Sequence, residues 1–194
     1  MIRGELFGTP MVKAFLNGNK NRTSRPIKPQ PFDLIGTDDY GVTFIDNDCK
    51  EYYQKPKHSV GDVVYVRETW RQTGVLSEPY AYFANEPELH LIGERGATLT
   101  VRYKWSPSIH MPREAARLWF RVTDVKVQRL DDVTEQDAEQ DGFISNAILI
   151  PDGSDYTGLY AYDRLMGFWR KTYPNDNWMW VYYLKPITKE EAET

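Results

Sequence analysis

Gly18-Asn19-Lys20-Asn21-Arg22-Thr23-Ser24-Arg25, followed by Pro26-Ile27-Lys28-Pro29-Gln30-Pro31, is the stretch from which the organisation of this chain is best understood. Every charged residue between Thr9 and Pro31 is basic, although the whole chain has a formal net charge of -4. Solvated surfaces usually mix charges of both signs. An acid-free segment in an acidic protein therefore indicates a site for an anion.

The residues before Lys20 predict a short helix. Thr9-Pro10 is typical of a helix N-terminus, and Gly18 stands where a left-handed C-cap ends a helix. Lys20 is therefore expected just beyond the helix end, fixed in position but accessible.

The residues after Lys20 predict an extended strand. Alternation along a strand places Thr23 and Arg25 on one face and Arg22 and Ser24 on the other. Lys20 is expected to approach the face of Thr23 and Arg25 from the turn, and the prolines that follow favour extended backbone leading away from the site.

Further along the chain, apolar and polar residues alternate in several strand-like segments. The predicted strands are 42–45, 63–68, 79–85, 98–105, 117–123, 125–129 and 178–184. We expect 79–85 to pair with 98–105, and 117–123 with 125–129. Two more helices are predicted, one from a capping box at Thr134 to Asp141 with Gly142 as its stop, and one over 160–172.

These elements predict one domain over residues 1–187, of the α+β class and rich in β-structure, because no regular βαβ alternation is present. A small β-barrel with peripheral helices fits them best. Residues 32–60, 86–96 and 143–158 are expected to be inserted loops, and 188–194 an acidic, flexible tail. Gly93-Glu94-Arg95-Gly96 is interpreted as a plain connection, because a lone Gly-x-x-Gly is too common to indicate a phosphate site.

The composition indicates the cellular compartment and one property of the ligand site. The single cysteine, Cys49, excludes an intramolecular disulfide, and no apolar run approaches the roughly 20 residues that cross a bilayer. The sequence also lacks a secretory signal, so we expect a cytoplasmic protein with no membrane partner. Six Trp and thirteen Tyr exceed the needs of a plain core, so some rings are expected to stack on a ligand.

Four blocks in order resemble a known family. Gly18-x-Lys20-x-x-Thr23-x-Arg25 is similar to the signature of ASCH domains, which are small PUA-like β-barrels linked to RNA and modified nucleosides. The likeness continues through residues 61–70 (GDVVYVRETW), 107–113 (PSIHMPR) and 178–181 (WMWV). Together the blocks bracket nearly the whole chain, and they resemble the phage-encoded branch, which implies the host cytoplasm.

The resemblance implies a reaction. Some ASCH proteins are amidohydrolases that remove the acyl group from N4-acetylcytidine with the Lys and Thr of the motif and a later carboxylate. These roles carry over to Lys20, Thr23 and Asp141, where the family usually has the longer Glu. Burial and the neighbours Arg22 and Arg25 are expected to lower the pKa of Lys20, so that its neutral amine can accept a proton from Thr23 or from water.

The other candidates are substrate-binding residues, namely Arg22, Arg25, Arg67, Glu68, His110 and Arg113. Arg25 could stabilise an oxyanion, and Asp141 or Glu68 could hold Lys20 or relay a proton. The structural alternatives are a phosphate contact for Lys20 and Arg25, a surface ion pair for Arg67 and Glu68, and ordinary hydrogen bonding for His110.

Three functions remain open: a hydrolase of an acylated pyrimidine, a non-catalytic reader of RNA or a modified base, and a metal-independent ribonuclease. The overall acidity disfavours a salt-sensitive grip on long nucleic acid and favours a nucleoside or a single flipped nucleotide. No cofactor is expected. No metal is expected either, since the Asp46-Asn47-Asp48 turn lacks the Gly and distal Glu of a calcium loop.

Overall fold

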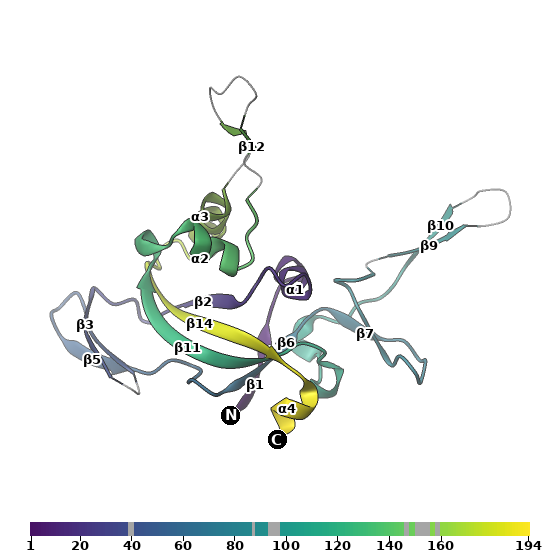
Figure 1. Ribbon diagram of the computed structural model, residues 1–194, viewed down its shortest axis with the longest axis horizontal. Helices are drawn as coiled ribbons and strands as arrows, with labels where there is room; N and C mark the ends of the chain where they lie inside the picture. Colours follow the sequence, from purple (N-terminus) through teal and green to yellow (C-terminus); the bar gives the residue numbers. More distant parts are fainter. Residues whose placement is uncertain (39–40, 87, 93–97, 146–147, 150–155, 158–159) are drawn as a thin grey trace.

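The computed structural model describes residues 1–38, 41–86, 88–92, 98–145, 148–149, 156–157 and 160–194. Its centre is a five-stranded sheet with the strand order β1-β6-β11-β14-β2 (Figure 1). The strands are β1 (Ile2–Leu6), β6 (Val63–Arg67), β11 (Trp119–Arg129), β14 (Trp178–Ile187) and β2 (Arg22–Pro26). β1 runs parallel to β6, and the other neighbours are antiparallel.

The α+β, β-rich class is confirmed, but the expected closed barrel is absent among the described strands. β1 and β2 are the two edges of an open sheet. Helix α1 (Thr9–Leu16) connects these edges, and its Phe15 packs on Phe7 and Phe120, with ring centroids 5.0 and 4.5 Å apart. Side chains of a helix therefore cover the region that a barrel would close with backbone hydrogen bonds.

The long antiparallel pair β11 and β14 forms the curved spine of the sheet (Figure 1). Segments 117–123 and 125–129 were predicted to pair with each other, and this is wrong, because both belong to the single strand β11. A β-bulge between Val122 and Asp124 shifts the register and reverses the alternation at that point. The predicted strand 178–184 is confirmed and extends to Ile187.

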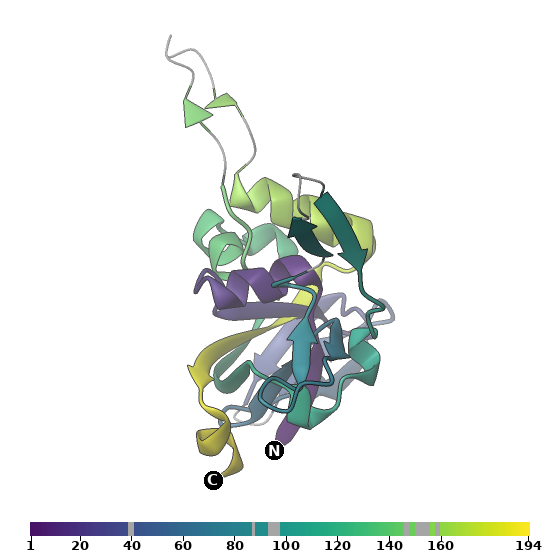
Figure 2. The same ribbon diagram turned by 90° about the vertical axis from the view of Figure 1, so that its right-hand side faces the viewer.

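The sheet separates two apolar clusters. Trp180, Tyr182 and Leu184 of β14 point into the larger one, together with Phe7, Phe15 and Phe120. Met179 and Val181 point the other way, towards α2 (Glu135–Gln140) and α3 (Ala161–Thr172). Both helices lie on the same side of β2 (Figure 2).

The helix ends mostly follow the sequence signals. Gly18 has a φ of 73°, and the capping box joins Thr134 to Asp137, both as predicted. α1 differs in one respect, because its N-cap is Gly8 and Thr9 is its first residue. Gly142 ends α2 with a φ of 92°, a left-handed conformation that favours glycine.

Small antiparallel units surround the main sheet (Figure 1). They are β3 (Asp33–Thr37) with β4 (Val42–Ile45) and β5 (Glu51–Gln54), β7 (Trp70–Gln72) with β8 (Tyr80–Tyr82), β9 (Glu88–Ile92) with β10 (Thr98–Arg102), and β12 (Ile148–Leu149) with β13 (Tyr156–Thr157). The predicted pairing of 79–85 with 98–105 is wrong, because β8 pairs with β7 and β10 pairs with β9, a strand inside the predicted loop 86–96.

Some predictions concern residues that the structure does not describe. The Gly93-x-x-Gly96 connection and residues 146–147, 150–155 and 158 of the predicted loop 143–158 lie outside the described residues. The predicted flexible tail forms a short helix, α4 (Lys189–Glu193), which Thr188 caps and whose Ala192 is buried. None of the helices within the described ranges is long and apolar enough to span a membrane.

Candidate functional site

Lys20 and Asp141 form a buried contact at the start of β2. Lys20 follows the turn that ends α1, and Asp141 is the C-cap of α2; an isolated β-bridge joins the two residues. The Nζ of Lys20 donates to the main-chain oxygen of Asp141 at 2.5 Å and lies 3.3 Å from its Oδ1. Only 5% of Lys20 and 4% of Asp141 are exposed, so the expected accessible lysine is a nearly enclosed one.

Burial lowers the pKa of Lys20 from 10.5 to about 8. Asp141 opposes this shift by charge and by hydrogen bonding, whereas the positive charges of Arg25 and Arg22 add to it. The direction is the one predicted from the sequence. A lysine with this pKa has an appreciable neutral fraction near neutral pH, which a general base needs.

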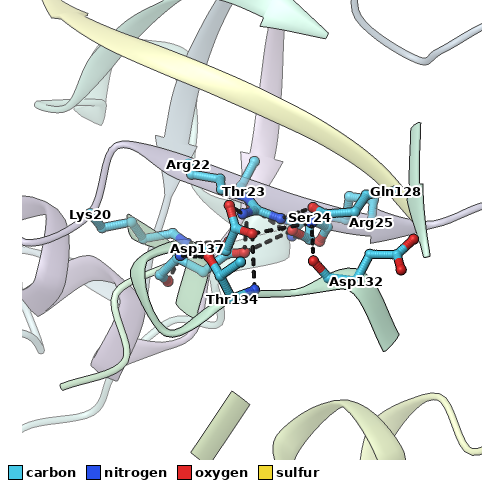
Figure 3. Close-up of polar contacts among 10 residues, drawn as sticks. Lys20, Arg22, Thr23, Ser24, Arg25, Gln128, Asp132, Thr134 and Asp137 are labelled. Carbon is cyan, nitrogen blue, oxygen red and sulfur yellow. Dashed lines mark hydrogen bonds and ion pairs between the residues drawn. The ribbon is translucent and has the colours of Figure 1, made fainter. Parts of the chain in front are cut away.

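Arg22 and Ser24 contact Asp141 from the face of β2 that α2 and α3 cover. Figure 3 shows both side chains with the labelled Asp137 and Gln128. Ser24 Oγ donates to Asp141 Oδ2 at 2.7 Å, and Arg22 Nε lies 3.4 Å from the same oxygen. Arg22 is fully buried and also makes an ion pair with Asp137 and a hydrogen bond to Gln128 Oε1. Arg22 is therefore a structural partner of two carboxylates, which leaves it little freedom to bind a substrate.

Thr23 and Arg25 lie on the other face of β2, as alternation predicts. Arg25 Nη1 donates to Thr23 Oγ1 at 2.9 Å and to the main-chain oxygen of Ser24 at 3.0 Å. Within the described part of the chain, Lys20 makes no hydrogen bond to Thr23. The hydroxyl that contacts the Lys20–Asp141 pair directly belongs to Ser24. Strand alternation predicted only that Ser24 lies on the opposite face from Thr23 and did not indicate a role for it.

Thr23 and Arg25 line a cavity of about 720 Å³, which we call the main cavity, on the face of the sheet that carries Trp180 and Tyr182. Its walls also include Glu5, Lys28, residues 53–55, Lys57, His58 and three aromatic residues, Tyr173, Trp180 and Tyr182. This volume is in the range of small-molecule sites. Flat aromatic walls together with cations suit a nucleobase and its attached groups.

A second, narrow cavity of about 60 Å³ lies at the edge of the sheet between β2, α1 and α3. It is lined by Lys20, Thr23, Ser24, Arg25 and Asp141, with apolar side chains such as Phe168 and Trp169 completing it. All three predicted catalytic residues thus line one space. Thr23 and Arg25 line both cavities.

The main cavity also contains a polar group that the sequence did not indicate. His58 Nε2 lies 2.9 Å from Glu5 Oε1, and the Nδ1 of the same buried ring has no hydrogen-bond partner among the described residues. Burial raises the pKa of the neighbouring Tyr182 to about 12, and its hydroxyl oxygen accepts the backbone N–H of Lys57 at 3.1 Å. Glu5 and His58 are 53 residues apart in the sequence, so no local motif could have indicated their contact.

The remaining predicted binding residues lie elsewhere. Arg67 donates to the main-chain oxygen of Ile109, beside His110 in the exposed turn η1 (Ser108–His110), and Arg113 of η2 (Arg113–Ala115) bonds Glu193 at 3.2 Å. None of these three residues, nor Glu68, lines the main or the narrow cavity.

Glu68 is the clearest departure from the predicted arrangement. It is 2% exposed, and its carboxylate accepts two hydrogen bonds from Arg117, at 2.8 and 3.0 Å. The alternative of a surface pair with Arg67 is also wrong, because the pair is buried and the partner is Arg117. Strand alternation explains this result, since it turns Arg67 and Glu68 to opposite sides.

Metal-binding groups of three or more His, Cys, Asp or Glu side chains do not occur among the residues that the structure describes. Asp46 instead accepts backbone N–H groups of Asp48 and Lys50 at 2.9 Å, as in an ordinary surface turn. Comparisons of the chain with protein-family models, with curated proteins and with solved structures found no match.

Proposed function

We propose that this chain is an ASCH-type, PUA-like protein of the cytoplasm that binds a modified pyrimidine nucleoside, free or within RNA, and removes an acyl group from its exocyclic nitrogen. N4-acetylcytidine is the proposed substrate. If the chain is encoded by a phage, the compartment is the cytoplasm of the host. The four sequence blocks that resemble ASCH domains support this assignment, as does the β-rich sheet with peripheral helices.

One observation carries the proposal. A buried lysine whose pKa is lowered to about 8 lies 3.3 Å from a carboxylate and shares a cavity with Thr23 and Arg25. Perturbed titratable groups that line a cavity mark functional sites more often than structural ones. Asp141 reaches Lys20 although it is one methylene shorter than the Glu of the family.

The geometry favours water over Thr23 as the nucleophile. Thr23 Oγ1 accepts a hydrogen bond from Arg25 and makes none with Lys20, whereas a cavity of about 60 Å³ has room for water beside the amine. In the proposed reaction neutral Lys20 takes a proton from this water, and the hydroxide attacks the acyl carbonyl. Arg25 stabilises the oxyanion, the C–N bond breaks, and protonated Lys20 returns the proton to the leaving amine.

The test is hydrolysis of N4-acetylcytidine, followed as acetate release, by the wild-type protein and by Lys20→Met. We expect the wild-type protein to release acetate and the variant to release none. An unchanged far-UV circular dichroism spectrum of the variant checks that it is folded. Equal turnover by both proteins, or no turnover by either, would contradict the proposal.

A non-catalytic reader is the second candidate function. One observation favours it: Lys20 and Asp141 do not line the main cavity, and of the described residues that line it only Thr23 and Arg25 also line the narrow cavity. Binding of N4-acetylcytidine without acetate release would support the reader. Shortening of a short RNA incubated with the wild-type protein would instead indicate the ribonuclease.

A further inference from the structure

We infer that the main cavity binds the phosphate group of a nucleotide through Lys55, so that the ligand of this protein is a phosphorylated nucleoside rather than a free one. This inference rests on the proposed function, which it makes more specific. None of the lysines of the main cavity belongs to the sequence motif, and none has a role in the reaction proposed above.

The first observation is the charge of the cavity wall. Four cations, Arg25, Lys28, Lys55 and Lys57, line the main cavity together with a single carboxylate, that of Glu5. The whole chain carries a formal net charge of -4, so this concentration of positive charge runs against the overall composition. A cavity that concentrates one sign of charge attracts ligands of the opposite sign.

The second observation is which of these cations are already neutralised. Lys28 Nζ lies 2.6 Å from a carboxylate oxygen of Asp176, and Lys57 is paired with Glu5. Lys55 has no carboxylate partner among the described residues. Arg25 donates to neutral oxygens of its own strand, and its charge helps to lower the pKa of Glu5. The wall therefore keeps an excess of positive charge, which suits a phosphate monoester with about -1.5 to -2 at pH 7.

The third observation is that the two segments carrying these cations are fixed to each other. Gln54 Nε2, next to Lys55, donates to the main-chain oxygen of Lys28 at 2.9 Å, and Lys28 follows β2. The backbone N–H of Lys57 donates to Tyr182 of β14 at 3.1 Å. The backbone segments that carry the cations are therefore held beside the aromatic wall on which a base would stack, which limits the ordering cost of binding to that of the lysine side chain.

The test compares the binding of three ligands by isothermal titration calorimetry at low salt: N4-acetylcytidine, its 5′-monophosphate, and a trinucleotide with N4-acetylcytidine at its centre. Each is titrated into the wild-type protein, into Lys55→Glu and into Lys104→Glu. Lys104 is an exposed lysine outside the main cavity, so its variant controls for the change in net charge.

We expect the monophosphate to bind the wild-type protein at least tenfold more tightly than the nucleoside, with this preference lost in Lys55→Glu, retained in Lys104→Glu, and reduced at high salt. Tight binding of the trinucleotide alone would identify an RNA phosphodiester as the source of the phosphate. Equal affinity for nucleoside and monophosphate, or a preference that Lys55→Glu leaves intact, overturns this inference while the proposed function stands. Binding of none of the three ligands overturns both.

Discussion

At the scale of single residues, the protonation of Lys20 controls the proposed chemistry. Its pKa of about 8 leaves roughly one tenth of the amine neutral at pH 7. Because the base must be deprotonated, we expect kcat/KM for N4-acetylcytidine to rise about tenfold from pH 6 to 7 and to level off above pH 8. A pH–rate profile measures this directly.

A matched pair of variants tests the same residue. Lys20→Arg keeps a cation that does not deprotonate in proteins and should lower kcat/KM by about 100-fold or more. Lys13→Arg makes the same change at an exposed lysine of α1 and should leave activity unchanged. A flat pH profile, or full activity in Lys20→Arg, would remove Lys20 from the role of base.

At this scale the sequence predicted those features that depend on local geometry. The opposite faces of Thr23 and Ser24 and the capping box at Thr134 were predictable, because each depends on neighbours within a few positions. The direction of the Lys20 pKa shift was predicted as well, although its largest cause is burial by the tertiary fold. The roles of Ser24, Glu5 and His58 were not. Each depends on a partner more than fifty residues away, which no spacing rule reveals.

At the scale of elements, the junction between α2 and α1 depends on Gly142. A Cβ added there would lie 2.8 Å from the Cβ of Ala14 and 3.2 Å from that of Lys20, at a φ of 92° that disfavours other residues. We expect Gly142→Ala to lower the free energy of unfolding by about 3 kcal/mol, measured by urea denaturation. The substitution should also reduce activity, because it displaces the element that carries Lys20.

Gly167 in α3 provides the control for that substitution. Among the described residues, and apart from its chain neighbours and the backbone of its own helix, no atom lies within 4 Å of the position of its added Cβ, so Gly167→Ala should stabilise the protein by up to about 1 kcal/mol. If Gly142→Ala proved as harmless as Gly167→Ala, the close packing of α2 on α1 would be contradicted.

The contact between β1 and the segment after β5 should make stability depend on pH. Burial alone would raise the pKa of Glu5, but hydrogen bonds from His58 and Lys57 and the nearby charges lower it from 4.5 to about 2. A carboxylate with a depressed pKa stabilises the fold above its unfolded pKa, and this contribution disappears as the pH falls from about 4.5 to about 2.

Glu5→Gln isolates that contribution. The substitution should lower the free energy of unfolding by about 2 kcal/mol at pH 7. This is less than the full pKa shift implies, because Lys57 is largely exposed and solvent screens its charge. Urea denaturation of both proteins between pH 7 and pH 2 should show the two stabilities converging below pH 4.5. A difference that is independent of pH would mean that the charge of Glu5 contributes nothing.

The errors in element prediction have physical causes. The bulge near Asp124 interrupts the alternation of β11, so one long strand looked like two in the sequence. α4 was not predicted because an acidic segment of five residues has little intrinsic helical stability. The burial of Ala192 against the body of the protein provides the additional stabilisation. Pairing partners such as β9 and β10 depend on topology, which alternation alone does not encode.

At the scale of the whole molecule, one buried stabilising contact lies outside the proposed site. The Glu68–Arg117 pair lies in neither the main nor the narrow cavity, yet the carboxylate is almost fully buried. Arg117→Leu would leave Glu68 buried without its cation and should cost about 3 kcal/mol in urea denaturation. Ligand affinity of the folded protein should not change.

Lys126→Ala is the comparison for Arg117→Leu, because Lys126 and Asp124 form an exposed pair with side chains 59% and 46% accessible. Its removal should change stability by less than about 1 kcal/mol. A fall in ligand affinity in Arg117→Leu, measured by calorimetry under conditions where the protein remains folded, would return Glu68 to the list of binding residues.

The contact between Lys20 and Asp141 joins positions 121 residues apart. During synthesis the amine leaves the ribosome well before its carboxylate, and β14, which pairs with β2, follows later still. A nascent or truncated chain therefore carries the complete N-terminal motif without the environment that lowers the pKa of its lysine. Acquisition of that environment is a late event in maturation, and turnover by this protein would report completed tertiary folding rather than the mere presence of the motif.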